Sequence, residues 1–209
     1  MRAVLICNGS VSSKLLHKNI SSSDFIVAVD GGANKLVKTK FRPDIIIGDM
    51  DSINSRARAA FKNVKMLSYP REKDMVDLEL ALNYCIEKKS SEILILGAVG
   101  SRVDMTLTNV FLLDKIPSDI NAKLIHQNQE IFIIRHSTEL HGIPGEIVSF
   151  FPLNKAVKGL TLTGFKYEIR NFSLRFGIGL GLSNEFKDKK AKVSFSEGPL
   201  VCVHFRKYY

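Results

Sequence analysis

Apolar and polar positions follow two different patterns along the chain, and the change falls near residue 128. Before that point, short continuous apolar runs are separated by helix-length segments, a pattern typical of strands buried on both faces of a sheet. The apolar runs lie at residues 3–8, 25–30, 44–49, 92–100 and 122–128. The candidate helices lie at residues 10–18, 33–38, 55–62, 74–89 and 104–116. Strands that alternate with helices predict a Rossmann-like, doubly wound parallel sheet with right-handed crossovers.

Beyond residue 128 the helical periodicity disappears. Short apolar runs are broken there by Gly, Pro, Asn and Asp, and they lie at 130–136, 145–153, 157–165, 167–176, 190–198 and 199–208. This pattern is typical of an antiparallel sandwich or barrel. The sequence therefore predicts an α/β plus all-β fold, with an α/β domain over residues 1–128 and an antiparallel β-sandwich over residues 129–209.

The charge balance of the chain is basic. Lys and Arg outnumber Asp and Glu by 30 to 21, which gives a formal net charge of +9. Such an excess suits an anionic partner such as a nucleotide or a phosphate. The basic residues are scattered, and the densest cluster is Lys187–Lys190. We therefore read most of the excess as solvated surface and expect no nucleic-acid partner.

Cysteine usage and hydropathy bear on the cellular compartment. Cys7, Cys85 and Cys202 lie far apart, which suggests neither a disulfide framework nor a zinc site. No apolar run reaches the roughly 18 residues of a membrane span, and the N-terminal run is too short for a secretory signal. We expect a soluble cytoplasmic protein with buried cysteines and no membrane partner.

The ends of the predicted parallel strands are the places to look for chemistry, because ligands bind outside the carboxyl ends of such strands. The second run ends in "VDGGAN", where Asp30 precedes Gly31 and Gly32. The glycines would allow close backbone approach to a ligand, and the following helix start would offer N–H groups to an anion. The alternative is an ordinary turn that Asp30 caps.

The third run ends in "GDMDS". In an extended chain Asp49 and Asp51 point to the same side, and two adjacent carboxylates suit Mg²⁺ that holds a polyphosphate. The alternative is that one aspartate is a helix N-cap and the other a turn former.

Two further acidic segments follow. In "REKDMVDLELAL", Asp74 and Asp77 have the spacing of a capping box, so the acids could exist only to start the helix. In "GAVGSRVDMTL", Arg102 could neutralise phosphate in a transition state. Asp104, two residues later, could cap the helix or orient metal-bound water. Neither a P-loop nor a GxGxxG motif is present. Four turns of this kind at successive strand ends are hard to explain as four independent caps.

These motifs, in this order and spacing, resemble those of the thiamine pyrophosphokinase family. The segments that carry the resemblance are "VDGGAN", "IIIGDMDS", "EKDMVDLELAL", "LGAVGSRVDMTL", "GFKYEIRN" and "GLGLSNEF", which together span nearly the whole chain. Members of the family transfer a pyrophosphoryl group from ATP to the hydroxyl of thiamine and release AMP. The resemblance implies a nucleotide-binding α/β domain, a C-terminal β-sandwich, and a homodimer whose active sites lie where the two subunits meet.

The resemblance also implies roles for single residues. The carboxylates that it implies for Mg²⁺ are Asp49, Asp51 and Asp77. The residues that it places near ATP and its phosphates are Asp30, Gly31, Gly32, Asn34, Lys73, Asp74, Arg102 and Asp104. The side chains that it implies for thiamine, from the partner subunit, are Ser183 and Asn184. Asp77 or Asp104 would accept the proton of the thiamine hydroxyl, and the sequence does not choose between them.

The chain departs from the family pattern at four positions. Glu72 replaces a shorter acid, Val76 replaces a threonine, Met105 replaces a frequent histidine and Tyr167 replaces a frequent tryptophan. None of these changes removes an implied metal ligand, but Val76 and Met105 remove hydrogen-bonding groups near the substrates. Two alternatives to the transferase therefore stay open: a non-catalytic thiamine or nucleotide sensor, and a related pyrophosphokinase with another acceptor or donor.

Overall fold

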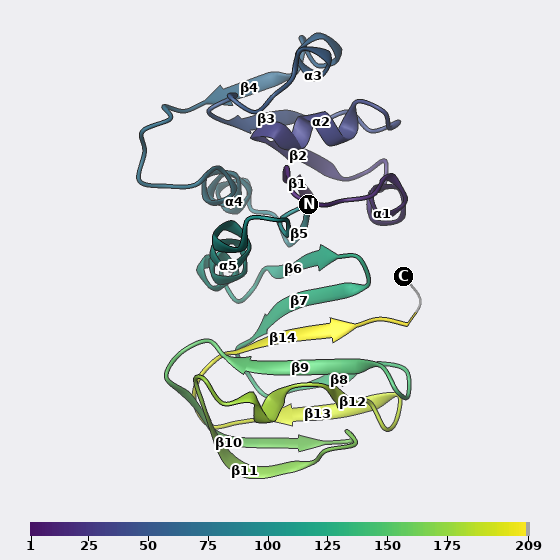
Figure 1. Ribbon diagram of the computed structural model, residues 1–209, viewed down its shortest axis with the longest axis vertical. Coiled ribbons are helices and arrows are strands. Elements are labelled where there is room, and N and C mark those ends of the chain that lie inside the picture. The colour runs from purple at the N-terminus through teal and green to yellow at the C-terminus, as the bar shows by residue number, and fades with distance from the viewer. Residues whose placement is uncertain (208–209) are drawn as a thin grey trace. The chain divides into compact units, whose positions relative to one another are not determined.

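The computed structural model describes residues 1–207, and the chain divides into two compact units, Met1–Gln127 and Asn128–Tyr209. Figure 1 draws the first unit in purple to teal and the second in green to yellow. The first unit is α/β and the second is all-β, so the predicted fold class is confirmed. The last predicted run, 199–208, ends at a tyrosine that lies outside the described residues.

The first unit is built on a parallel sheet with the strand order β6-β5-β1-β2-β3-β4. The strands are β1 (Arg2–Ile6), β2 (Phe25–Val29), β3 (Ile45–Gly48), β4 (Lys65–Ser68), β5 (Glu92–Leu96) and β6 (Asn121–His126). The chain winds from β1 to one edge and then returns to build the other, which is the doubly wound topology. Strand β4 was not predicted, because "KMLS" is short and its exposed ends are polar.

The helices of the first unit follow the predicted order. They are α1 (Ser13–Asn19), α2 (Ala33–Leu36), α3 (Ser55–Ala60), α4 (Asp77–Glu87) and α5 (Val103–Phe111), with short 3₁₀ turns η1 (Asp30–Gly32) and η2 (Leu112–Lys115). Within residues 1–207, no helix is long and apolar enough to cross a membrane.

Helix α4 begins three residues later than predicted. Its N-cap is Val76, whose side chain makes no capping hydrogen bond. The capping box that the spacing of Asp74 and Asp77 offered as an alternative is therefore not formed. Leu78, Leu82 and Cys85 are buried on the helix, as its periodicity predicts.

Strand β3 lies in the core of the first unit. Ile45, Ile46 and Ile47 are all buried, and each contributes about 2 kcal/mol of hydrophobic stabilisation. The neighbouring strands β2 and β4 are parallel to β3 on its two sides. This packing fixes the point at which the chain leaves the sheet after Gly48.

The second unit contains two antiparallel sheets, with strand orders β12-β9-β14-β7 and β11-β10-β13-β8. The strands are β7 (Gln129–Ile134), β8 (Thr138–His141), β9 (Ile147–Pro152), β10 (Ala156–Thr163), β11 (Ile169–Arg175), β12 (Asn184–Glu185), β13 (Lys190–Ser194) and β14 (Leu200–Phe205). Strands β8 and β12 were not predicted, since both are short and partly polar. Phe150, Phe165 and Phe186 pack edge to face in the core of this unit.

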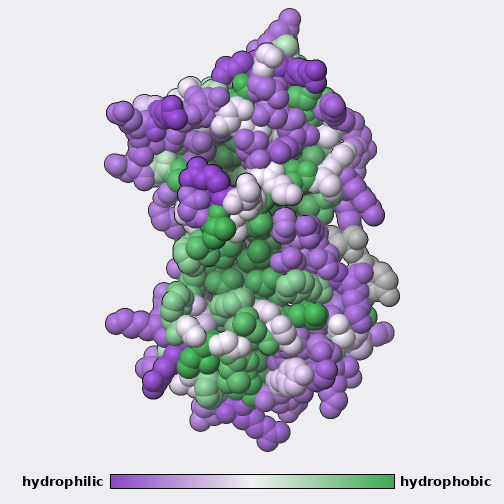
Figure 2. Space-filling model, viewed as in Figure 1, coloured by the Kyte–Doolittle hydropathy of each residue, from purple (hydrophilic) through white to green (hydrophobic). Residues whose placement is uncertain are grey.

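Strand β9 is apolar on both of its faces. Phe150 lies opposite Cys202 on the core side, whereas Phe151 lies opposite Val201 on the other side. Ile147 and Phe151 are each 40% exposed. Figure 2 shows hydrophobic side chains gathered over β9 and β14. An apolar outer face of this kind is a candidate contact surface.

Candidate active site

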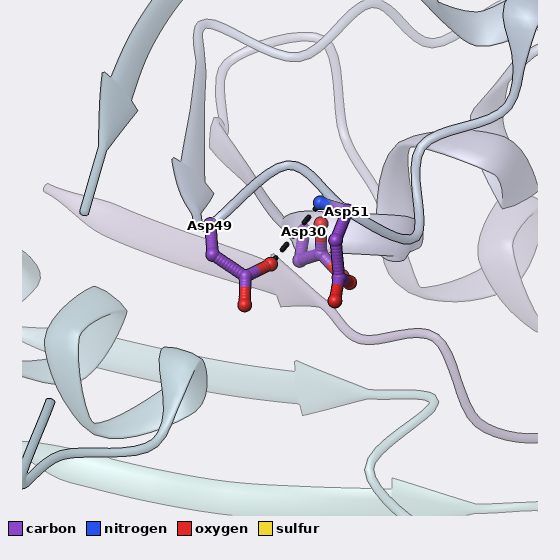
Figure 3. Close-up of side chains that lie close together, drawn as sticks. All are labelled: Asp30, Asp49 and Asp51. Atoms are coloured by element: carbon purple, nitrogen blue, oxygen red, sulfur yellow. Dashed lines mark hydrogen bonds between the residues drawn. The ribbon is translucent and has the colours of Figure 1, made fainter. Parts of the chain in front are cut away.

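Three carboxylates meet where β2 and β3 end. The two strands are parallel and in register, with Val29 opposite Ile47, so the residues that follow them leave the sheet at the same edge. Asp30, Asp49 and Asp51 each place one carboxylate oxygen within 4.8 Å of the others. Figure 3 shows the three side chains brought together from these two turns. We call this group the acidic cluster.

Two members of the acidic cluster are partly bound within their own turn. Asp49 Oδ1 accepts a hydrogen bond from the backbone N–H of Asp51 at 3.1 Å. Asp51 Oδ1 accepts one from Ser52 Oγ at 2.8 Å. Asp49 thus forms the turn that the sequence offered as an alternative to metal binding, while Asn54 is the residue that caps the next helix. Turn formation leaves other oxygens of both carboxylates available.

Asp30 has no such partner. It is 7% exposed, and its Oδ1 atom is buried without a hydrogen bond to any described residue. A buried carboxylate oxygen without a partner is costly, and the cost rises when two other carboxylates lie beside it. A divalent cation bound by hard oxygen ligands removes both costs. The residues present therefore fit Mg²⁺, with Asp30 beside Asp49 and Asp51. The metal-binding role that the resemblance implies for Asp77 stays a prediction.

The turn after β2 is packed tightly against the protein itself. A Cβ atom on Gly32 would lie 1.8 Å from the carbonyl oxygen of Ile6, and one on Gly31 would lie 2.4 Å from Asn8 Nδ2. Both glycines are buried. Glycine is therefore required at position 32, where the contact is with the backbone of β1, whereas at position 31 the Asn8 side chain would have to shift to admit a Cβ atom.

Asn34 connects this turn with the loop that follows the acidic cluster. Its Nδ2 donates to the carbonyl oxygen of Ser52 at 2.8 Å, and its Oδ1 accepts from the backbone N–H of Asn54 at 3.0 Å. Both ends of the amide thus hold the 52–54 loop in place. Asn34 positions the segment that carries Asp49 and Asp51, and its predicted contact with ATP stays a prediction.

Lys73 lies beside the acidic cluster and pairs with Asp77. Its Nζ atom is 2.9 Å from Asp77 Oδ1 and 4.0 Å from Asp49 Oδ2, and it donates to the carbonyl oxygen of Pro70 at 3.2 Å. Burial raises the pKa of Asp77 and the charges of Asp49 and Asp30 add to this, while Lys73 opposes the rise. Asp77 is thus close enough to the acidic cluster for the charges of Asp49 and Asp30 to affect its pKa, and it forms an ion pair with Lys73.

A cavity of about 610 Å³ opens in the first unit at this edge of the sheet. Its walls include Asp30, Asp51, Lys73, Asp74, Asp77 and Arg102. The apolar replacements Val76 and Met105 also line it. Cavities of a few hundred Å³ or more accommodate nucleotide-sized ligands.

Two other cavity residues have distinct chemistry. Cys7 is buried, and burial, with a smaller contribution from Asp77, raises the pKa of its thiol to about 12, so it is no nucleophile. Asn109 donates from Nδ2 to the carbonyl oxygen of Ala98 at 2.7 Å, and its buried Oδ1 has no described partner.

Arg102 and Asp104 form an exposed ion pair at the start of α5. Arg102 Nε donates to Asp104 Oδ1 at 3.2 Å, and Nη2 donates to Oδ2. The hydrogen bond from Arg102 is the main reason that the pKa of Asp104 is lowered. Arg102 lines the cavity and is the N-cap residue of α5. Asp104 pairs with the side chain of Arg102 and is not the N-cap. The two candidate bases thus differ, with a raised pKa at Asp77 and a lowered one at Asp104.

The predicted thiamine contacts lie in the second unit. Ser183 is exposed, with a positive φ of 52°, and its backbone N–H donates to Ser149 Oγ at 3.1 Å. Asn184 is buried; its Oδ1 accepts from the N–H groups of Tyr167 and Glu185, and its Nδ2 donates to the carbonyl oxygen of Tyr167. The amide of Asn184 thus joins β12 to the 165–168 segment, and its contact with thiamine stays a prediction.

Comparison with known proteins gives a consistent result for both units. Residues 16–125 match the family model described as "Thiamin pyrophosphokinase, catalytic domain", and residues 132–200 match "Thiamin pyrophosphokinase, vitamin B1 binding domain". The chain belongs to the thiamin pyrophosphokinase family. The thiamine pyrophosphokinase of Bacillus subtilis (strain 168) is 32% identical over 190 residues, which cover 85% of each chain.

Solved structures of the family have the same fold. The B. subtilis thiamine pyrophosphokinase superimposes with a TM-score of 0.89 at 28% identity, over 99% of this chain and 100% of that one. The Geobacillus thermodenitrificans protein gives 0.86 at 28% identity, over 100% and 99%. The Candida albicans protein gives 0.83 at 19% identity, over 99% and 89%, which shows the shared fold alone.

Sequence reasoning missed two features of this site. The resemblance places Asp30 in a phosphate-side turn, and the structure adds that its carboxylate is a member of the acidic cluster. The resemblance places Lys73 near ATP, which stays a prediction, and the structure adds its ion pair with Asp77. The end-to-end alignment of β2 with β3 could have suggested the first, because Asp30 and Asp49 both follow a strand directly. No sequence signal reports the second, since it depends on the path of residues 70–76.

Proposed function

We propose that this chain is a Mg²⁺-dependent thiamine pyrophosphokinase that transfers the pyrophosphoryl group of ATP to the hydroxyl of thiamine and releases AMP. The observation that carries the proposal is the acidic cluster with the unpartnered Asp30 oxygen, beside a cavity that Lys73 and Arg102 also line. Family membership supplies the substrates. We place the reaction in the cytoplasm, where ATP and Mg²⁺ are available.

The residues of the site divide the work as follows. Asp30, Asp49 and Asp51 would hold Mg²⁺, which supplies charge neutralisation on the phosphates when bound. Lys73 and Arg102 would add positive charge around the transferred group. The thiamine hydroxyl oxygen then forms a bond to the β-phosphorus, and the bond from that phosphorus to the oxygen of the leaving AMP breaks.

The hydroxyl proton needs an acceptor. Asp77 lines the cavity and has a raised pKa, which suits a general base, whereas Asp104 is exposed and bound by Arg102. We therefore favour Asp77 for this role, or for a further metal contact once Lys73 has moved. Asp74, Gly31, Gly32 and Asn34 would shape the phosphate side of the site.

We propose that the unit beyond residue 128 binds thiamine and forms the homodimer. Support comes from the outer face of β9, where Ile147 and Phe151 are exposed, and from exposed Ser183 near the end of the same sheet. Sedimentation of the wild type and of Phe151→Glu tests the dimer. We expect the wild type to sediment as a dimer and the variant to shift toward monomer. A monomeric wild type would contradict the proposal.

Product identification tests the proposed activity. Wild-type protein incubated with thiamine, ATP and Mg²⁺ should form thiamine diphosphate and AMP in equal amounts, and Asp51→Asn should form neither. Formation of ADP with thiamine monophosphate, or no product under these conditions, would contradict the proposal. The exposed Asp188→Asn variant, which lies in the second unit, is the matched control and should keep full activity.

The apolar side chains of Val76 and Met105 in the cavity wall favour a second candidate, a sensor that binds thiamine or nucleotide without turnover. Calorimetry separates the two functions. Saturable thiamine binding by a protein that forms no AMP would favour the sensor. Exchange of thiamine for other alcohols, and of ATP for other nucleotides, in the same product assay tests for a different acceptor or donor.

A further inference from the structure

Lys73 occupies a central position among the carboxylates of the site. Its Nζ atom is 2.9 Å from Asp77 and 4.0 Å from Asp49, and all three side chains are largely buried, at 14%, 24% and 14% exposed in that order. Lys73 belongs to the 70–76 loop that precedes α4, and its Nζ atom donates a hydrogen bond to the carbonyl oxygen of Pro70 in the same loop. An ammonium therefore lies between two carboxylates of the proposed metal-binding region.

The carboxylates need this charge when no metal is bound. Asp30, Asp49 and Asp77 lie near one another, and their mutual repulsion would be severe without a cation. Among the described residues, the ion pairs to Asp49, Asp51 and Asp77 come from Lys73 and from Arg71, which is 3.7 Å from Asp51. Arg71 is 83% exposed, so solvent screens its charge. Lys73 is therefore the main internal counter-ion.

In this position Lys73 would compete with a divalent cation for Asp49. Metal that enters the acidic cluster would use Asp49, whose Oδ2 faces the ammonium. A positive charge a few ångströms from a divalent cation repels it, and in a partly buried site water screens this repulsion poorly. Metal binding therefore favours departure of Lys73 from Asp49.

Lysine is suited to such a move, because its ammonium is a point charge on a flexible stem. Lys73 lines the cavity, where the phosphates of a nucleotide would provide new anionic partners. We propose that Lys73 is an exchangeable counter-ion: it holds Asp77 and Asp49 before metal binds, and then transfers its charge to the nucleotide phosphates. This inference rests on the proposed function and adds an order of events to it.

Metal affinity without nucleotide tests the first half of the exchange. Free Mn²⁺ is measured by electron paramagnetic resonance at pH 8, in titrations of the wild type, Lys73→Met and Lys73→Arg. We expect Lys73→Met to bind Mn²⁺ about tenfold more tightly than the wild type, because the competing charge is gone. Lys73→Arg keeps the charge and should stay within about twofold.

The chain offers a matched control. Lys115 pairs with Glu79, which lies two residues after Asp77 on α4 and therefore faces a different side of the helix. Lys115→Met removes an ammonium from such a pair and should leave Mn²⁺ affinity unchanged. Thermal unfolding checks that every variant is folded, and Lys73→Gln replaces Lys73→Met if the latter does not fold.

Nucleotide affinity tests the second half. Calorimetric titration with ATP and Mg²⁺, without thiamine, should give about tenfold weaker binding for Lys73→Met, because a phosphate contact is lost. The two effects thus have opposite signs, which a purely structural ion pair would not produce. Unchanged or weaker Mn²⁺ binding by Lys73→Met would overturn the inference, and so would tighter Mn²⁺ binding with unchanged ATP affinity. The product assay on the wild type decides the proposed function separately.

Discussion

Asp30 in the first unit and Glu146 in the second are both buried carboxylates, at 7% and 2% exposed. Glu146 accepts hydrogen bonds from several groups around it, namely Ile143 N, Lys207 N, His204 Nε2 and Arg206 Nη1. Asp30 Oδ1 accepts none from the described residues and faces two further carboxylates instead. Hydrogen bonds within the second unit thus compensate the buried charge of Glu146, whereas no hydrogen bond from the described residues reaches Asp30 Oδ1.

The difference separates a structural charge from one that is available to a ligand. Burial alone would raise the pKa of Glu146, but the N–H groups of Lys207 and Ile143, together with His204 and Arg206, outweigh it and lower the pKa. Every donor belongs to the same unit, so the network holds the start of β9 to the end of β14. The acidic cluster has no comparable set of donors among residues 1–207, which is why we assign it to a cation.

The largest expected effect is on activity. Asp49→Asn removes a cluster charge and should lower the rate of thiamine diphosphate formation by about 10³-fold or more, because the metal loses a ligand. The free energy of unfolding should stay the same or rise, since repulsion within the cluster is relieved. Product formation and chemical denaturation measure the two quantities. A variant that loses stability and activity in parallel would contradict the comparison.

Glu146→Ala should have the converse effect. Removal of Glu146 leaves His204 Nε2 and the backbone N–H groups of Ile143 and Lys207 without their acceptor, and should destabilise the second unit by about 3 kcal/mol. Mn²⁺ affinity should not change. The control is Glu197→Ala, which breaks the exposed pair with Lys158 and should cost less than about 1 kcal/mol. Equal losses for the two variants, measured by urea unfolding, would show that burial of Glu146 does not matter.

Asn184 and Ser183 provide a second pair for the same comparison. Asn184→Ala leaves the backbone groups of Tyr167 and Glu185 without partners and should cost about 2 kcal/mol of stability. Ser183→Ala changes an exposed side chain and should leave stability within about 0.5 kcal/mol. If Ser183 contacts thiamine, its variant should raise the KM for thiamine alone. An Asn184→Ala protein of wild-type stability would contradict the structural role.

The pH dependence of stability should have opposite signs in the two units. Because the pKa of Glu146 is lowered from its ordinary value of 4.5, the charged carboxylate stabilises the fold at pH values above 4.5, and this contribution is lost as the pH falls further. Burial lowers the pKa of His204 below 6.5, so its contribution is lost as pH falls below 6.5. The raised pKa of Asp77 has the opposite effect, because its contribution to stability is present below pH 3.8 and is lost as the pH rises.

Thermal unfolding between pH 7 and about pH 3.5 tests these signs, at no more than about 1.4 kcal/mol per pH unit for each proton. His204→Gln should flatten the loss of stability below pH 6.5. Asp77→Asn should make the wild-type loss steeper, because it removes the opposing contribution. A steeper loss in His204→Gln would show that the histidine is not buried in its neutral form.

The smallest expected effect concerns Val76. This residue is the N-cap of α4, with φ −75° and ψ 157°, and its side chain cannot accept a hydrogen bond. Val76→Thr keeps the shape and supplies a capping oxygen, so it should stabilise the first unit by about 0.5–1 kcal/mol. Val103→Thr makes the same change just inside α5, where no cap is needed, and should give no such gain. A gain in both variants would exclude capping as the cause.

The sequence predicts the fold well where a pattern repeats. The continuous apolar runs locate β1, β2, β3, β5 and β6 to within a few residues, because strands buried on both faces tolerate few polar side chains. Strands β4, β8 and β12 lack this signal, being short and partly exposed. Their pairing depends on neighbouring strands rather than on their own composition.

The candidate site is predicted only in part, for a related reason. Asp49 and Asp51 are two residues apart, so their proximity follows from local geometry, although through a turn at Met50, whose φ is 66°, and not through the extended chain that we expected. Asp30 joins them through the register of β2 with β3, and Lys73 joins Asp77 through the path of a loop. The predicted start of α4 at Asp74 failed because residues 71–75 form that loop instead of a helical turn. Long-range contacts of this kind produce no regular spacing of residues in the sequence from which they could be predicted.

The most direct test of the metal assignment is anomalous diffraction from crystals soaked in Mn²⁺, recorded near the Mn absorption edge. We predict an anomalous peak within coordination distance of Asp30, Asp49 and Asp51, with Lys73 Nζ farther from Asp49 than its present 4.0 Å. A peak elsewhere in the first unit, or the absence of a peak at saturating Mn²⁺, would contradict the account.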